Sequence, residues 1–122
     1  MINFTIGIPP ITKKNHSQII MVKGRPRVIP SKQYIQYEKD CQFFMPRILT
    51  IDKRINVKAI YYMPTRRKVD LPNLHNALHD VLVAYRVVAD DNSNIIASTD
   101  GSRVFYDKEN PRTEVEITEV GD

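Results

Sequence analysis

Hydrophobic and polar residues alternate in three stretches of the chain, with the period expected of a strand that has one buried face. Residues 2–8 alternate until Pro9-Pro10, residues 55–63 alternate until Pro64, and residues 113–120 alternate near the end of the chain. We therefore expect three strands here, the last of which places its glutamates on a wet face of the sheet.

Two other stretches carry hydrophobic residues at spacings of three and four, which is the helical period. The first follows Ser31, a good N-cap, and ends near Pro46. The second follows Asp70 and runs from Leu71 to Tyr85. Both stretches are predicted to be amphipathic helices.

The segment between the first strand and the first helix, residues 12–30, is basic and predicts a hairpin arm, because Lys23-Gly24-Arg25-Pro26 separates two apolar pieces. A further strand is expected over about 95–106, with an irregularity at Asp100-Gly101. The predicted order is strand, arm, helix, strand, helix, strand, strand. At 122 residues the chain has room for one α/β (α+β) domain over residues 1–122, with no linker.

The charge of the chain is unevenly distributed. Residues 1–69 contain 14 bases and 3 acids, a balance of +11, whereas residues 70–122 contain 4 bases and 11 acids, a balance of −7. This asymmetry favours a polyanion-binding face beside a cluster of carboxylates, as a metal-dependent nucleic-acid enzyme requires. The alternative is that the two charged surfaces pair within the fold or across a dimer.

The sequence also bears on location. The single Cys41 cannot form a disulfide within the chain, and no apolar run approaches the roughly 20 residues that span a bilayer. The N-terminus lacks the basic and apolar regions of a secretory signal. We therefore expect a cytoplasmic protein without membrane association, in which Cys41 is a core residue.

The second helix carries a polar stripe beside its buried face. At about 100° per residue, Asp70, Asn73 and Asp80 lie on this stripe and Asn76 lies at its edge. His75 and His79 lie on the other flank. Two histidines at this spacing can share a metal, but a third ligand is missing, so surface or dimer packing is the favoured interpretation.

Asp70, Asp90 and Asp91 are the carboxylates that could hold Mg²⁺ for phosphodiester hydrolysis. They flank a predicted helix of about 16 residues, roughly 24 Å long. Either the chain folds back after Asp91 to bring them together, or two subunits combine. The structural alternative is that Asp70 is an N-cap and that Asp90-Asp91-Asn92 is an ordinary turn.

Several motifs together resemble one family. The segment Tyr62-Met63-Pro64-Thr65-Arg66-Arg67-Lys68-Val69-Asp70-Leu71-Pro72-Asn73-Leu74, followed by Asp80-Val81-Leu82 and Asp90-Asp91, is similar to the core of the RusA-type Holliday junction resolvases. Pro9-Pro10 with Lys13-Lys14-Asn15, and Asn110-Pro111-Arg112 before the last strand, resemble its flanking segments. The resemblance implies a small homodimer with a mixed β-sheet and two main helices that cuts four-way DNA junctions symmetrically with Mg²⁺.

The resemblance also assigns roles to individual residues. The catalytic and metal-binding residues are expected to be Asp70, Asp90 and Asp91, with Asp91 the stronger match of the acidic pair. Supporting positions are Asn73, Asn76 and Asp80. Contacts to DNA phosphates are expected from five bases: Lys13, Lys14, Arg66, Arg67 and Lys68.

Two positions depart from the family pattern. The family commonly reads Asp-x-Asp-Asn at the start of this helix, whereas Pro72 replaces the second acid here. A catalytic lysine of the family corresponds to Asn76, which keeps a hydrogen-bond donor without the positive charge. The alternative function is therefore a catalytically weakened protein that binds branched DNA, and a third is a structural or interaction protein.

Overall fold

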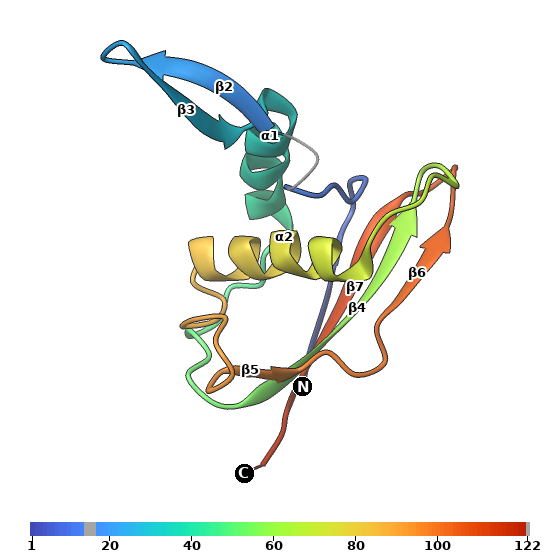
Figure 1. The fold of residues 1–122 in the computed structure, drawn as a ribbon. Coiled ribbons are helices and arrows are strands. Elements are labelled where there is room, and N and C mark those ends of the chain that lie inside the picture. Colours follow the sequence, from blue (N-terminus) through green and yellow to red (C-terminus); the bar gives the residue numbers. More distant parts are fainter. Residues whose placement is uncertain (14–16, 122) are drawn as a thin grey trace.

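The structure, a computed structural model, describes residues 1–13 and 17–121. Its elements follow the predicted order (Figure 1). They are β1 (Ile2–Ile6), β2 (Ser17–Val22), β3 (Arg25–Pro30), α1 (Lys32–Cys41), a 3-10 turn (Gln42–Phe44), β4 (Ile55–Met63), α2 (Leu71–Ala84), β5 (Ile96–Ser98), β6 (Arg103–Tyr106) and β7 (Arg112–Glu119).

The main sheet is mixed, as expected. Its order is β1-β7-β4-β5, and β6 pairs with β4 as well. Strand β7 runs antiparallel to both of its neighbours, β1 and β4, whereas β5 and β6 both run parallel to β4. The fold is thus a small α+β domain with a five-stranded sheet and two helices.

The strand predicted over 95–106 is in fact two strands, β5 and β6, and Asn56 on β4 explains the break. Its Oδ1 accepts from Ser98 Oγ at 2.6 Å and from the Asp100 backbone N–H at 2.7 Å, while its Nδ2 donates to the Asp100 carbonyl at 3.1 Å. Ser102 Oγ then accepts the Ala59 N–H at 3.0 Å. Between β5 and β6, hydrogen bonds that involve side chains therefore replace the backbone ladder along β4.

The core lies between the sheet and the helices (Figure 1). Alternate residues of β4 from Ile55 to Tyr61 are at most 2% exposed, and they face the apolar stripe of α2. Cys41 is fully buried and is therefore a core residue, as predicted. This burial raises the pKa of its thiol to about 12. Ser31 caps α1, because its Oγ accepts the Tyr34 N–H at 3.1 Å.

The predicted hairpin arm is present. Strands β2 and β3 form a separate two-stranded sheet that projects from the body of the molecule (Figure 1). Lys23 and Gly24 at its turn have φ values of 51° and 77°. Positive φ at both central residues is the turn geometry that matches the twist of a hairpin.

In the part of the chain that the structure describes, no helix combines the length and the apolar character needed to cross a membrane.

Candidate active site

Asp70 lies immediately before α2, in an extended conformation. Its side chain makes no capping bond to the backbone of the helix. Instead, one carboxylate oxygen accepts from Asn73 Nδ2 at 3.3 Å. The residue is exposed, so its carboxylate is open to a ligand. Asp70 therefore occupies the N-cap position, as the structural alternative predicts, but its side chain does not cap the helix.

Asp90 and Asp91 form the turn that follows α2, and both are exposed. The two oxygens of Asp90 accept from the Asp91 N–H at 2.7 Å and from Asn92 Nδ2 at 3.1 Å. The pKa of Asp91 is raised, first by partial burial, then by hydrogen bonding with Asp90 and its charge, and further by the charge of Asp80. Two of the predicted acids are therefore neighbours, and Asp80 is close enough to Asp91 to influence it.

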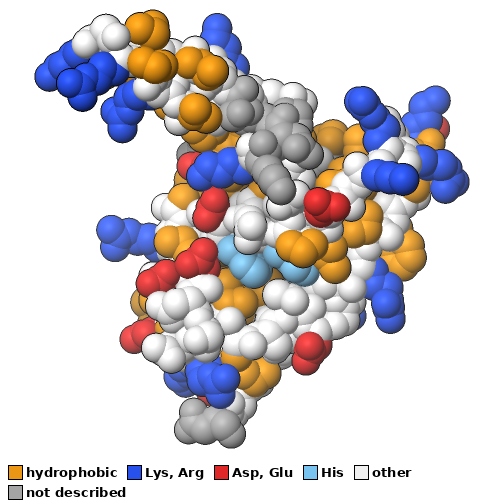
Figure 2. All heavy atoms as spheres, in the orientation of Figure 1, with side chains coloured by type: hydrophobic (Ala, Val, Ile, Leu, Met, Phe, Trp, Pro, Cys, Tyr) orange, Lys and Arg blue, Asp and Glu red, His pale blue; other side chains and the backbone are white. Residues whose placement is uncertain are grey.

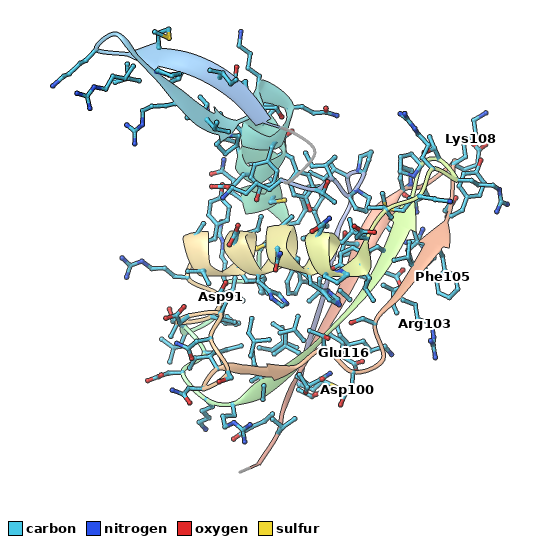
Figure 3. All side chains as sticks on the ribbon, in the orientation of Figure 1. Asp91, Asp100, Arg103, Phe105, Lys108 and Glu116 are labelled. Carbon is cyan, nitrogen blue, oxygen red and sulfur yellow. The ribbon has the colours of Figure 1, made fainter. Side chains whose placement is uncertain are left out.

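Asp70 does not join this pair within one chain. Helix α2 has 14 residues and is about 21 Å long, and Asp70 precedes it whereas the Asp90-Asp91 turn follows it. Figure 3 shows Asp91 beside the half of α2 that is far from Asp70's end. Among residues 1–13 and 17–121, no three His, Cys, Asp or Glu side chains are grouped closely enough to hold a metal ion. The chain thus does not fold back to bring the three aspartates together.

The polar stripe predicted on α2 borders an open hollow. Asn73, Asn76 and Asp80 line this hollow together with Lys13 from the loop after β1. Lys13 Nζ lies 3.4 Å from Asp80 Oδ2. One predicted DNA contact is therefore paired with one predicted supporting acid, while Lys14 lies outside the described residues.

His75 and His79 occupy the other flank of α2, as predicted, but they are packed more deeply than surface residues. The Tyr61 hydroxyl and His75 Nδ1 are 2.7 Å apart, and the two imidazoles stack with centroids 5.7 Å apart at 4°. Both Nε2 atoms are buried without a hydrogen-bond partner. Burial lowers the pKa of both rings, that of His79 to about 4. The pair is a neutral packing element.

The depressed pKa of His79 predicts acid sensitivity. An unfolded chain protonates this histidine near its ordinary pKa of about 6.5, whereas the folded chain does so only near 4. Its contribution to stability is complete above pH 6.5 and is lost between 6.5 and 4, by up to about 3 kcal/mol. Urea unfolding from pH 7 to pH 4 measures this loss. The free energy of unfolding should fall less steeply with decreasing pH in His79→Gln than in the wild type. If both proteins lose the same free energy between pH 7 and pH 4, His79 is not the source of the loss.

The basic residues of the loop between β4 and α2 are exposed. Arg66, Arg67 and Lys68 all lie on this loop, and Figure 2 shows basic side chains gathered at the tip of the arm and again at the upper right of the body. The guanidinium of Arg66 lies over the Tyr106 ring, 4.2 Å from its centroid. A cation held on an aromatic face is pre-oriented for phosphate contact.

Sequence reasoning missed the aromatic side chains beside this loop. Phe105 and Tyr106 on β6 are 48% and 38% exposed, and the Tyr62 ring lies 5.7 Å from that of Phe105. All large apolar residues of β6 are exposed in the structure. The alternation pattern of the sequence does not show this, because it predicts one buried face for each strand. Stacking of bases on such rings is a sequence-tolerant way to bind nucleic acid.

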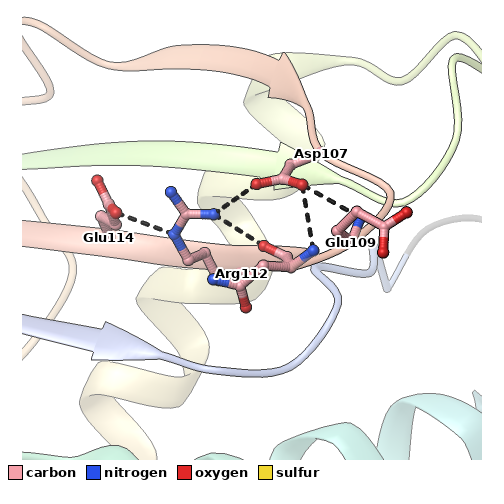
Figure 4. A network of polar contacts seen from close by, with 5 residues as sticks. Asp107, Glu109, Arg112 and Glu114 are labelled. Atoms are coloured by element: carbon pink, nitrogen blue, oxygen red, sulfur yellow. Dashed lines mark hydrogen bonds and ion pairs between the residues drawn. The ribbon is translucent and has the colours of Figure 1, made fainter.

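Arg112 fixes the turn between β6 and β7 (Figure 4). Its guanidinium donates to Asp107 and Glu114, each at 2.9 Å, and stacks on Tyr62 at 3.8 Å. Asp107 also accepts the N–H groups of Glu109 and Asn110. Hydrogen bonding from Arg112 lowers the pKa of Asp107. Because two carboxylates neutralise Arg112, its role is structural.

Comparisons with known proteins bear on the family of the chain. A model of the endodeoxyribonuclease RusA family matches residues 8–118, which is most of the chain. A search of the curated proteins found no match. Members of the matched family are metal-dependent nucleases. The chain therefore belongs to the RusA family of Holliday junction endodeoxyribonucleases.

Proposed function

We propose that the protein is a homodimeric, Mg²⁺-dependent endonuclease that resolves four-way DNA junctions, with Asp70, Asp90 and Asp91 as its catalytic and metal-binding residues. The observation that carries this proposal is the open carboxylate at each end of α2. Asp70 makes no capping bond, and Asp91 is oriented by Asp90, which accepts its N–H. Exposed carboxylate oxygens are the ligands that Mg²⁺ prefers.

A bound Mg²⁺ supplies an activated water and a counter-charge for the phosphate oxygens. The residues of the chain supply the donors and their orientation. Asn73 donates to one oxygen of Asp70, and no other described residue donates a hydrogen bond to that carboxylate. Asp90 uses one lone pair of each oxygen in the turn, so it retains lone pairs for a ligand.

The length of α2 supports the dimer. Two carboxylates that bind one Mg²⁺ each place an oxygen about 2.1 Å from it, whereas within one chain Asp70 and the Asp90-Asp91 turn flank a helix about 21 Å long. Among the described residues, no three His, Cys, Asp or Glu side chains lie close enough to hold a metal ion. In a two-fold pair with antiparallel α2 helices, the start of each helix lies beside the end of the other. Each Asp70 would then complete a site with the Asp90-Asp91 turn of the second copy, which gives two equivalent sites for symmetric cleavage.

Asp80 and Asn76 are the supporting residues of this proposal. Asp80 lies near enough for its charge to raise the pKa of Asp91, and Lys13 partly offsets that charge at 3.4 Å. Asn76 faces the same hollow. Its amide can donate a hydrogen bond to a phosphate oxygen, without the electrostatic attraction of a lysine.

The alternative function, a catalytically weakened junction-binding protein, rests on Pro72 and Asn76. A proline in the first helical turn costs little, because that N–H has no partner within the helix. The residue therefore suits the helix while providing no carboxylate.

The experiment that tests the proposal is incubation of the protein with a labelled four-way junction in Mg²⁺ or in EDTA, with a linear duplex of the same sequence as control. We expect paired cuts in the junction in Mg²⁺ only, and no cutting of the duplex. Absence of cutting in Mg²⁺, with binding retained, would favour the alternative.

A variant separates the two functions further. If the chain is catalytically weakened, Pro72→Asp combined with Asn76→Lys should create cleavage or raise it strongly. Robust cleavage by the wild type, with no gain in the double variant, would reject the alternative.

Salt dependence tests the basic loop. Junction affinity should fall with salt by about 0.9 log units per log unit for each neutralised phosphate. Replacement of Arg66, Arg67 and Lys68 by Gln should therefore reduce the slope by about 2 to 3. Lys53→Gln, just before the opposite end of β4, is the matched control. An unchanged slope in the triple variant would remove these residues from the DNA interface.

A further inference from the structure

The arm formed by β2 and β3 has two chemically different faces. The antiparallel register places Ile19 opposite Val28 and Met21 opposite Pro26, so these four residues share one face. Arg25 and Arg27 belong to the other face, opposite Val22 and Ile20. One face of the arm is therefore wholly aliphatic over these two pairs.

The aliphatic face has no partner among residues 1–13 and 17–121. Ile19, Met21 and Val28 are 71%, 67% and 72% exposed. Figure 2 shows hydrophobic side chains along the arm and basic ones at its tip. A contiguous aliphatic band on a projecting element indicates a surface that is covered when the protein functions.

The charges of the arm select the molecule that covers it. Every charged residue from Ser17 to Tyr37 is basic, and the bases on the arm itself are Lys23, Arg25 and Arg27. DNA complements such a segment, because phosphates surround the flat apolar faces of its bases. Ile, Met and Pro are also residue types that proteins insert between base steps.

We propose that the arm is a wedge that inserts its aliphatic face into the branch point of the junction and holds the adjacent base pairs unstacked. Arg25 and Arg27, on the other face, bind the phosphates of the displaced strands. This inference rests on the proposed function, since it assigns the arm to the same DNA substrate. A two-stranded ribbon is narrow enough to enter a DNA groove or an open branch point.

A second copy of the chain is the other occupant to consider, and the observations favour it less. A stable dimer buries about 800 Å² per partner, more than four aliphatic side chains can supply.

The experiment uses a four-way junction with 2-aminopurine beside the branch point, in EDTA so that the DNA remains uncut. Unstacking raises the fluorescence of this base. The wedge variant combines Ile19→Thr, Met21→Gln and Val28→Thr, which keeps residues that tolerate a strand. Leu49→Gln, at a leucine that is 93% exposed on the body, is the matched control.

We expect wild type and Leu49→Gln to raise the fluorescence about twofold or more at saturation. The wedge variant should lose most of this rise, while its affinity for the junction falls less than about tenfold. The two effects differ because stacking and phosphate contacts contribute separately to binding. Arg25→Gln with Arg27→Gln should do the reverse, with weaker binding but a normal rise at saturation.

A wedge variant that retains the full rise would overturn the proposal. If the wild type sediments as a dimer and the wedge variant sediments as a monomer, the proposal is overturned too, because the aliphatic face would then pack against a second copy. The proposed function fails separately. A wild type that unstacks the branch point in EDTA but does not cut it in Mg²⁺ would support the wedge and reject the endonuclease.

Discussion

Asp70→Asn and Asp91→Asn should each reduce the rate of four-way junction cleavage by about a hundredfold or more, because a lost metal ligand removes several kcal/mol of transition-state stabilisation. Asparagine keeps the size of the side chain and loses the charge that holds the cation. Binding should persist in both variants, since the proposed phosphate contacts come from other residues. Single-turnover cleavage and a gel-shift titration measure the two effects.

Asp52→Asn is the matched control, because Asp52 is an exposed aspartate near the opposite end of β4 from the basic loop. We expect it to cleave at the wild-type rate. Cleavage by Asp70→Asn or Asp91→Asn at a rate within a few-fold of Asp52→Asn would remove that residue from the site.

Much of the fold could be predicted from the sequence, because its elements follow from local patterns. The strand at 55–63 and the Ser31 cap were predicted at the positions found, since alternation and capping chemistry depend on near neighbours. Residues 95–106 were predicted as one strand because the pattern does not show that Asn56 takes over the hydrogen bonds of Asp100. That interaction joins residues 44 positions apart.

The candidate site could be predicted less completely. Helical geometry predicted Asn73 and Asp80 on one stripe with Asn76 at its edge, apart from His75, and the structure shows that the three residues line one hollow. It could not show that Lys13 pairs with Asp80, nor that Tyr106 supports Arg66, because these contacts join distant segments. The roles of Asp70, Asp90 and Asp91 remain predictions.

A mixed dimer of Asp70→Asn and Asp91→Asn chains tests the central claim, that two copies share each site across antiparallel α2 helices. If Asp70 of one copy works with Asp91 of the other, the mixed dimer contains one site with both residues intact. It should then cleave one strand at about half the wild-type rate per dimer, although both parent variants are inactive. If each site lies within one chain, both sites are defective.

The measurement is junction cleavage by the mixed dimer, co-expressed with two tags and purified through both. A dimer of wild type with Asp70→Asn is the control, because it retains one active site under either arrangement. Strand nicking should reappear in the mixed dimer at a rate similar to that of this control. A mixed dimer as inactive as its parents, or two chains that do not purify together, would contradict it.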